Sequence, residues 1–467
     1  MRGKSLLLVA VCLCLGSVAL SHGRAWLRAE TAPAVFEFSV EATSPSDSAR
    51  LGQTYDVVTR RGDVLVVLGD AQTQRKLEAD GFIIRAVRPL PLPELAFGAQ
   101  TYYGGYRTVA EMEAFMDSIA AARPDLATVI TYGHSWRKAN NRPNGHDLKA
   151  ICLTRRRLQD CQLNPNTDKP RLLLIAAIHP RELSTSEMAL RWIEFLVNDY
   201  GVHPDVTWLM DDHELWVIPV ANPDGRWIVE QGSPTPYTQR KNANDTQGTC
   251  SVPPNDWSQH GVDLNRNASF QWLAQSNPCS LTYPGTAPAS EPEQQALEAL
   301  MAQLFHDQRG AGLNDAAPIT STGVMLTLHS YSDLILLPWG WVSCSTTTGC
   351  SPSQRAPNDA GLRALAFRMG YFTGYAIGQA SELLYSARGT TDDWAYGVLG
   401  IPAFTFEIGP DWWQSCGGFM PPYTCQDTFW ALNREAFLYA AKVARQPYAL
   451  SHGPTVIAAA VTPSAVV

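Results

Sequence analysis

Short, uninterrupted hydrophobic runs alternate with amphipathic stretches along most of the chain. Runs of this kind are typical of strands that are buried on both faces, and amphipathic stretches are typical of helices that cover a sheet. The sequence therefore predicts an α/β fold with a mixed, largely parallel central sheet and helices on both faces. The expected strands are RLLLIAAI (171–178), ELWVIPVA (214–221), GVMLTLH (323–329) and PAFTFE (402–407).

Two amphipathic stretches predict helices of the main domain. In residues 184–197, Met188, Trp192 and Phe195 recur at helical spacing, which indicates a face packed on the core. In residues 291–305, the preceding pattern Ser290-x-x-Glu293 predicts a capping box at the helix start.

The first 101 residues have a different organisation. Residues 55–88 follow the order strand, strand, helix, strand, and a proline-rich stretch follows at 89–101. We expect a small α+β N-terminal module (30–88), a linker (89–101), a main domain (102–447) and a C-terminal tail (448–467). The alternative, that the module is the first layer of a single domain, stays open.

The extreme N-terminus has the features of a secretory signal peptide. Arg2 and Lys4 precede an apolar stretch, and a small-x-small pattern ends it near residue 21. A membrane anchor is the alternative, but the stretch is short and is interrupted at Gly16 and Ser17. We therefore expect residues 1–21 to be removed and the protein to be secreted or periplasmic, with no membrane attachment afterwards.

The cysteines agree with export. Outside the signal segment they fall into four neighbouring couples, which fits local disulfides in an oxidising compartment. A four-cysteine zinc knot is disfavoured because no C-x-x-C pair occurs. The eight residues are Cys152, Cys161, Cys250, Cys279, Cys344, Cys350, Cys416 and Cys425.

The charge balance argues against nucleic acid as a partner. The chain has 44 acidic and 36 basic residues, a net charge of -8, and no Lys/Arg run that would follow a phosphate backbone. We expect a monomer that acts on other molecules in solution.

Polar residues follow the predicted strands where each one ends. His179 and Glu182 follow the first strand, His329 closes the third and Glu407 closes the fourth. In open α/β sheets the carboxyl ends of the strands meet at one edge, where ligands bind. A single His-x-x-acid pair has little weight, since His260-x-x-Asp263 is another.

Two histidines and one glutamate can hold a catalytic zinc and leave a position for water. His179 and Glu182 can reach one ion from a single turn, and His329 can complete the set from another strand. The family resemblance described below implies that these three residues bind one Zn²⁺ per chain. Attack of water on an amide also needs a carboxylate to move the proton, and Glu407 is the candidate.

Several ordered motifs, taken together, are specific. The sequence resembles the zinc carboxypeptidases of the carboxypeptidase A/B type, as a bacterial-like secreted member, over about residues 102–447. The motifs are HPRE (179–182), NPDG (222–225), GVDLNRN (261–267), SEPE (290–293), LHSYSDLILLPWG (328–340) and FTFE (404–407).

The resemblance implies roles for further residues. Arg240 would polarise the scissile carbonyl, Asn265 and Arg266 would bind the substrate's terminal carboxylate, and Tyr385 would close over it. Asp263 would be the partner of a ligand histidine. The remaining positions implied in substrate binding are Arg181, Ser330, Tyr331 and Asp392.

Asp392 matches the family position that lines the pocket for the terminal side chain. An acid there favours substrates that end in Lys or Arg, because a buried carboxylate is costly without a cationic partner. The alternative is that Asp392 caps the turn that follows and points elsewhere.

The leading hypothesis is a secreted zinc metallocarboxypeptidase whose partners are peptides or proteins with a free C-terminus. Two alternatives stay open: a related zinc amidohydrolase for cell-wall or other non-protein amides, and a non-catalytic peptide-binding protein of the same fold. A serine hydrolase is disfavoured because no G-x-S-x-G motif occurs.

Overall fold

The computed structural model describes residues 35–90, 102–233, 235–345 and 348–451. The predicted signal segment, most of the predicted linker and residues 452–467 lie outside these ranges. All of the described residues belong to one compact unit by their internal contacts.

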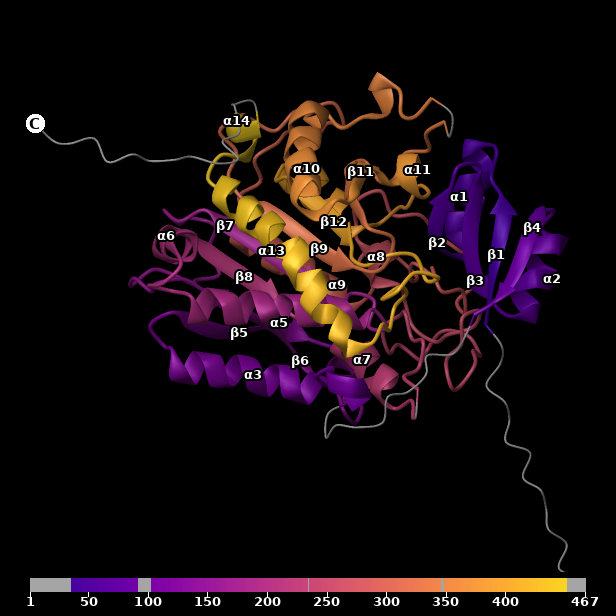
Figure 1. Cartoon of the computed structure of the whole chain (residues 1–467), viewed down its shortest axis with the longest axis horizontal. Helices are drawn as coiled ribbons and strands as arrows, with labels where there is room; N and C mark the ends of the chain where they lie inside the picture. The colour runs from indigo at the N-terminus through magenta and orange to yellow at the C-terminus, as the bar shows by residue number, and fades with distance from the viewer. Residues whose placement is uncertain (1–34, 91–101, 234, 346–347, 452–467) are drawn as a thin grey trace, which may run out of the picture. The chain divides into compact units, whose positions relative to one another are not determined.

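A four-stranded antiparallel sheet with two helices forms the N-terminal part (Figure 1). Its strand order is β2-β3-β1-β4. The elements are β1 (Phe36–Glu41), α1 (Pro45–Thr54), β2 (Asp56–Arg61), β3 (Val64–Gly69), α2 (Ala71–Ala79) and β4 (Ile84–Pro89). Each helix starts at a polar cap: Ser44 accepts from the Asp47 N–H, and Asp70 accepts from the N–H groups of Gln72 and Thr73.

The larger sheet has eight strands in the order β11-β10-β12-β9-β7-β8-β6-β5. Four of its seven strand pairs are parallel, and three are antiparallel. The predicted mixed α/β fold is confirmed. The strands are β5 (Ala127–His134), β6 (Asp147–Leu153), β7 (Arg171–Ala176), β8 (Glu214–Ile218), β9 (Val324–His329), β10 (Leu334–Leu337), β11 (Ala376–Gln379) and β12 (Ala403–Glu407).

Helices cover both faces of this sheet. Neighbouring residues of β12 show this, because side chains alternate between faces along a strand. The Phe406 ring packs on Phe437 of α13, whereas the preceding residue, Thr405, donates its hydroxyl to Asp392 of α12. Figure 1 shows α13 and α5, which are in contact, lying across the strands.

The helices of this region vary widely in length. The α-helices are α3 (Val109–Ala122), α4 (Trp136–Ala139), α5 (Leu183–Asn198), α6 (Pro204–Asp212), α7 (Pro223–Glu230), α8 (Leu264–Asn267), α9 (Pro292–Leu304), α10 (Asp359–Thr373), α11 (Ala380–Leu383), α12 (Thr391–Leu399), α13 (Gln426–Val443) and α14 (Pro447–Ser451). Short 3₁₀ turns occur at Tyr102–Gly105, Pro352–Gln354 and Tyr423–Cys425.

One local prediction is wrong, and one predicted boundary lies inside a helix. Helix α9 has Glu291 as its N-cap, without the predicted box between Ser290 and Glu293, because Glu293 accepts from the Trp136 N–H and the Asn242 amide instead. The tail predicted from residue 448 begins as helix α14, where Tyr448 is buried and donates its hydroxyl to the Gly400 carbonyl.

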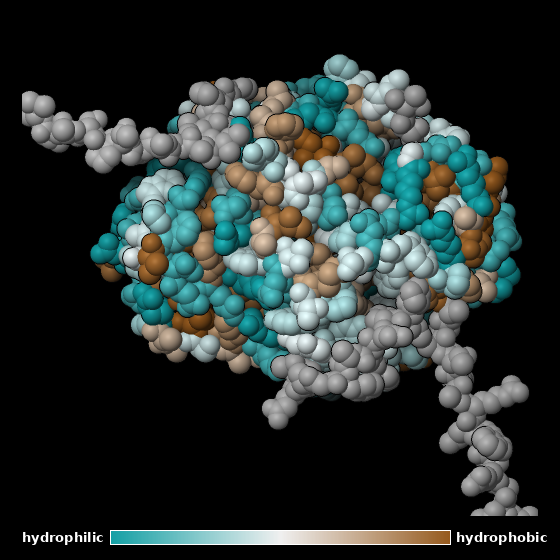
Figure 2. Space-filling model, viewed as in Figure 1, coloured by the Kyte–Doolittle hydropathy of each residue, from teal (hydrophilic) through white to brown (hydrophobic). Residues whose placement is uncertain are grey.

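The central strands form the core. Strands β7, β8, β9 and β10 are buried along their whole lengths, which matches the continuous apolar runs in the sequence. On the face seen in Figure 2, apolar areas are interspersed with polar ones. Within the described residues, no helix combines the length and the apolar character needed to cross a membrane.

All four predicted cysteine couples are disulfides: Cys152–Cys161, Cys250–Cys279, Cys344–Cys350 and Cys416–Cys425.

The sheet topology positions the candidate site. Strands β12, β9 and β7 are adjacent and mutually parallel, so their carboxyl ends lie at one edge. The residues that follow these strands therefore converge there.

Candidate active site

Three buried side chains converge at the carboxyl ends of β7 and β9. His179 and Glu182 lie in the tight segment between β7 and α5, and their Nδ1 and Oε1 atoms are 2.8 Å apart. His329 is the last residue of β9, and its Nδ1 lies 3.2 Å from Oε2 of Glu182 and 3.1 Å from Nδ1 of His179. Each residue offers one ligand atom, and these atoms lie within 4.8 Å of one another.

The other ring nitrogens are held by second partners. Nε2 of His179 is 3.1 Å from the Asp263 carboxylate, and Nε2 of His329 is 3.2 Å from the Thr327 hydroxyl. An Nε2–H that donates to Asp263 leaves the Nδ1 lone pair of His179 facing the cluster. Two imidazoles and one carboxylate oriented in this way are a donor set that fits zinc.

The electrostatics of the cluster favour a charged carboxylate. Burial raises the pKa of Glu182, but the two histidines more than offset this and hold the pKa below its usual value. The backbone N–H of Ser330 also donates to Oε2 of Glu182 at 3.2 Å. A cation at this point would meet a ligand that is already ionised.

Glu407 lies directly beside the cluster. It ends β12, and the parallel register places it opposite His329 on β9. Its side chain lines the same cleft as the three donors. Burial, followed by repulsion from Glu182, raises the pKa of Glu407 well above its usual value. A divalent cation in the cluster would oppose part of this rise.

Asp263 connects the cluster to the rest of the site. One carboxylate oxygen faces His179 and accepts from the Asn265 N–H at 3.0 Å, and the other accepts from Nε of Arg240 at 3.0 Å. Burial raises the pKa of Asp263, but Arg240, His179 and Arg266 together keep it well below its usual value. The arginine predicted to polarise the carbonyl is therefore fixed by the carboxylate that orients a ligand histidine.

The residues predicted to bind a terminal carboxylate also meet in this cleft. Asn265 and Arg266 belong to the short helix α8, whose N-cap is Asp263. Nη2 of Arg266 donates to the Tyr385 hydroxyl at 2.9 Å, although 119 residues separate the two. Cys250 and Cys279, which form a disulfide, precede and follow this segment in the sequence.

Asp392 lies at the wall of the cleft. Apolar residues that also line the cleft include Leu336, Ala380 and Leu384. The Asp392 carboxylate accepts from the Thr405 hydroxyl at 3.1 Å and from the Asp393 N–H at 3.0 Å. Ser330 and Tyr331 line the same cleft.

The comparisons with known proteins agree with this geometry. The profile of the zinc carboxypeptidase family matches residues 112–436. The chain belongs to the zinc carboxypeptidase family. The family binds zinc, and His179, Glu182 and His329 are a donor set that fits this ion.

Two relatives illustrate the extent of the likeness. The chain is 30% identical to mouse carboxypeptidase A2 over 315 residues, which is 67% of this chain and 64% of that protein, slightly under two thirds of its length. It is 27% identical to a zinc carboxypeptidase of Saccharothrix mutabilis subsp. capreolus over 438 residues, 90% of this chain and 92% of that protein.

Solved structures show the same fold. Carboxypeptidase A from Helicoverpa armigera has a TM-score of 0.65 at 22% identity, covering 88% of this chain and 97% of that one. The thrombin-activatable fibrinolysis inhibitor has a TM-score of 0.63 at 20% identity, covering 88% of this chain and 98% of that one.

Arg181 is the predicted site residue whose surroundings differ most from the expectation. It is fully buried, and its Nη2 donates to both carboxylate oxygens of Asp56, at 2.8 and 2.7 Å. Asp256 lies 3.5 Å from its other terminal nitrogen, and the Phe419 ring lies 4.0 Å from the guanidinium carbon. A residue of the small sheet therefore occupies the position where substrate contact is predicted.

Asp56, Val57 and Val58 all line the cleft, and sequence reasoning missed them. They belong to β2, which was predicted as an ordinary strand of a separate module. No local pattern marks Asp56, since its partner Arg181 is 125 residues away.

Zinc bound by His179, Glu182 and His329 should stabilise the folded protein. At a free zinc concentration of 100 times Kd, the free energy of unfolding should rise by about 2.7 kcal/mol, because the ion binds the folded state. Thermal unfolding of metal-stripped protein with and without zinc measures this. His329→Ala should lose the rise, and His134→Ala, an exposed histidine paired with Asp147, should keep it. An equal rise in His329→Ala would place the ion elsewhere.

Proposed function

We propose that this protein is a zinc metallocarboxypeptidase that removes single residues from the C-termini of peptides and proteins. The observation that carries the proposal is the meeting of four features in one cleft: the His179–Glu182–His329 cluster, Glu407, Arg240, and the Asn265–Arg266 pair. Family membership supports the same activity.

The chemical roles follow from the positions. Zinc, when bound, polarises the scissile carbonyl and lowers the pKa of water towards neutrality. Glu407 takes the proton of the attacking water and passes it to the leaving nitrogen. Burial raises the pKa of Glu407, which makes it a stronger base than an ordinary carboxylate. Arg240, fixed by Asp263, donates to the oxygen on which negative charge develops.

Selection of chain ends comes from Arg266. A guanidinium can give a carboxylate two parallel charge-assisted hydrogen bonds, which an internal peptide bond cannot accept in the same way. Tyr385, whose hydroxyl already contacts Arg266, closes the site over the carboxylate.

Hydrolysis of matched peptides tests the proposal. The same peptide is offered with a free or an amidated C-terminus, and released amino acid is measured before and after chelation. We expect the free acid to be cleaved, the amide to be cleaved at least about 10-fold more slowly because it lacks the charge that Arg266 binds, and chelation to stop both. Cleavage of cell-wall peptides alone would favour the amidohydrolase alternative. Zinc-dependent binding without cleavage would favour the peptide-binding alternative.

We further propose a preference for terminal Lys or Arg, set by Asp392. Asp392 lines the cleft, and among the described residues its hydrogen-bond donors are neutral, the Thr405 hydroxyl and the Asp393 N–H, so an incoming cation would give this buried carboxylate a charged partner.

Asp392→Asn should therefore lower the ratio of kcat/KM for Lys-ended over Phe-ended peptides by roughly 30-fold, equivalent to about 2 kcal/mol for one charged hydrogen bond. Both values come from initial rates with otherwise identical peptides. Asp307→Asn, an exposed carboxylate outside the cleft, should leave the ratio unchanged. A parent protein that already prefers Phe would contradict this role of Asp392.

Export is part of the proposal. The four disulfides support folding in an oxidising compartment, so the protein would be secreted or periplasmic. The signal-like segment at residues 1–21 supports the same location. We propose that the protein acts there as a monomer.

The N-terminal module is proposed to be a propeptide that covers the cleft. Three contacts support this. Asp56 binds Arg181, the Ser332 hydroxyl donates to the Val58 carbonyl at 2.8 Å, and α1 packs so closely that a Cβ on Gly52 would overlap the Tyr385 ring. The module and the cleft wall also share one buried hydrophobic cluster. A peptide could not reach Arg181 while Asp56 is there.

A further inference from the structure

The wall of the terminal side-chain pocket is built on a very short helix. Ala380 and Leu384, in α11 and immediately after it, line the cleft together with Leu336 of β10. Helix α11 has four residues, which is a single turn. A single turn is not stable by itself, so contacts outside the pocket must fix the position of this wall.

Glu382 provides such contacts from the side of α11 that does not line the cleft. Its carboxylate accepts from the Gln379 N–H at 2.8 Å, from Nη2 of Arg363 at 2.9 and 3.1 Å, and from the Cys350 N–H at 3.4 Å. Arg363 is in turn held by Asp359 of α10 at 2.9 Å. Burial raises the pKa of Glu382, but these donors outweigh it and lower the pKa below its usual value.

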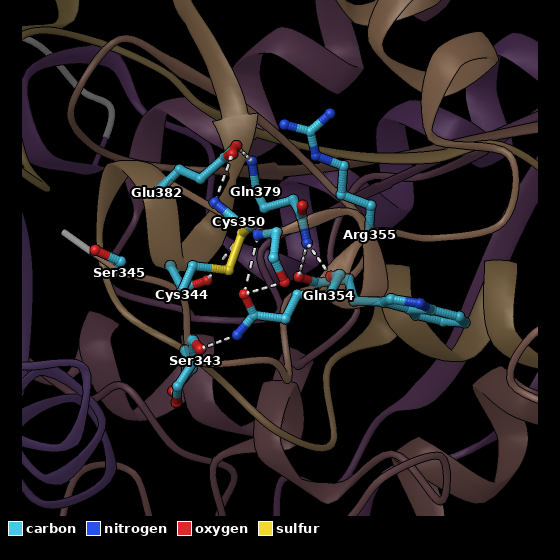
Figure 3. The surroundings of a disulfide bond; sticks show 12 residues. Ser343, Cys344, Ser345, Cys350, Gln354, Arg355, Gln379 and Glu382 are labelled. Carbon is cyan, nitrogen blue, oxygen red and sulfur yellow. Dashed lines mark hydrogen bonds between the residues drawn. A yellow bond between two sulfur atoms is a disulfide. The ribbon is translucent and has the colours of Figure 1, made fainter. Parts of the chain in front are cut away.

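A disulfide joins the same group of contacts. Cys350, which donates to Glu382, is bonded to Cys344, and Figure 3 shows Glu382, Gln379 and Gln354 around this bridge. The Gln354 amide donates to the Ser343 carbonyl at 2.6 Å, next to Cys344.

The group also contacts a second segment of the cleft lining. The Gln379 amide donates to the Trp339 carbonyl at 3.0 Å, and the next residue, Gly340, lines the cleft. The Ala387 N–H donates to the Gly340 carbonyl at 2.9 Å. Both segments of the lining are therefore connected to one set of polar contacts that does not itself line the cleft.

We propose that Glu382 is a positioning residue for the terminal side-chain pocket. Together with Arg363 and the Cys344–Cys350 disulfide it forms a brace that fixes Ala380 and Leu384, and so sets how well a large terminal side chain is bound. Glu382 does not line the cleft and takes no part in the bond-breaking step. The inference rests on the proposed carboxypeptidase activity, which it deepens.

The test compares full-length parent, Glu382→Gln and C344A/C350A on peptides that end in Lys, Phe or Ala, with the N-terminal module in the same state in every sample. We expect both variants to raise KM for the Lys and Phe ends by roughly 10-fold, the size typical of altered pocket contacts, with kcat and the Ala-ended peptide changed less than about twofold. Combining the variants should add little, because both act on one brace.

Glu435→Gln is the matched control. Glu435 is a partly exposed carboxylate paired with Arg434 at 2.9 Å on α13, and its loss should leave every ratio unchanged. Thermal unfolding identifies any variant that does not fold, and Glu382→Gln keeps the shape of the side chain.

Amide hydrogen exchange decides the proposal independently of activity. Exchange over residues 380–387 should be faster in Glu382→Gln than in the parent or in Glu435→Gln. An active parent with unchanged substrate ratios and unchanged exchange in Glu382→Gln would overturn the brace. A parent that stays inactive after cutting within residues 89–101 and removal of the module would overturn the proposed function, while faster exchange in Glu382→Gln would still support the positioning role.

Discussion

Replacing Glu407 with Gln should lower kcat on a free-acid peptide by roughly 10³-fold, within the range that general acid–base catalysis contributes. The amide of Gln has nearly the same shape but cannot accept the proton of the attacking water. Because Glu407 ends β12 beside His329 and is not among the three metal donors, bound zinc and thermal stability should stay close to those of the parent. Initial rates, metal content and unfolding temperature measure the three quantities.

The control for this variant is Glu298→Gln. Glu298 lies on α9, where it accepts from the Ser269 N–H outside the cleft, so its loss should not change kcat. Hydrolysis by Glu407→Gln at the parental rate would show that another group moves the proton. Loss of zinc together with activity would show that Glu407 acts on the metal site.

The parts of the fold that the sequence predicted are those determined by local pattern. The apolar runs located β7, β8, β9 and β12 within a few residues, and the differences at their ends have local causes. Strand β7 stops before Ala177, whose φ of 50° is not extended, and β8 stops before Pro219, which has no N–H for the ladder. The converging site residues were predictable because they follow strands that end at one edge.

The parts that the sequence did not predict depend on contacts between distant segments. The capping box predicted from Ser290-x-x-Glu293 does not form, because the Glu293 carboxylate accepts a hydrogen bond from the Trp136 N–H, 157 residues away. Helix α1 was missed because its sequence, PSDSARLGQT, is mostly polar and buries few side chains. Its packing on Tyr385 depends on Gly52 having no side chain, a feature that only the assembled structure reveals.

Asp263 illustrates how one buried residue can support several parts of a site. The same carboxylate orients His179 and Arg240 and caps the helix that carries Arg266. The candidate metal donor His179, Arg240 and the helix that carries Arg266 are therefore connected through one buried residue. They share one rigid support at the edge of the sheet.

Asp56→Ala should raise kcat/KM of the full-length, uncut protein by roughly 10²-fold. Breaking a buried ion pair costs about 3–5 kcal/mol. Asp256, which lies 3.5 Å from Arg181, would offset part of this cost. The free energy of docking of the module should therefore weaken by about 2.7 kcal/mol, which corresponds to the 10²-fold change. Once Asp56 is gone, peptide can compete for Arg181. Rates are measured on protein shown by mass spectrometry to be uncut.

Two comparisons make this result specific. Asp63→Ala also removes a carboxylate from the module, but Asp63 pairs with Arg85, which is exposed. Activity should therefore stay at the parental level. Cutting within residues 89–101 and removing the module should bring the parent and Asp56→Ala to the same activity, since Asp56 would then be absent from both. If the uncut parent already matches the cut enzyme, the module does not restrict the cleft, and Asp56 is only a structural partner of Arg181.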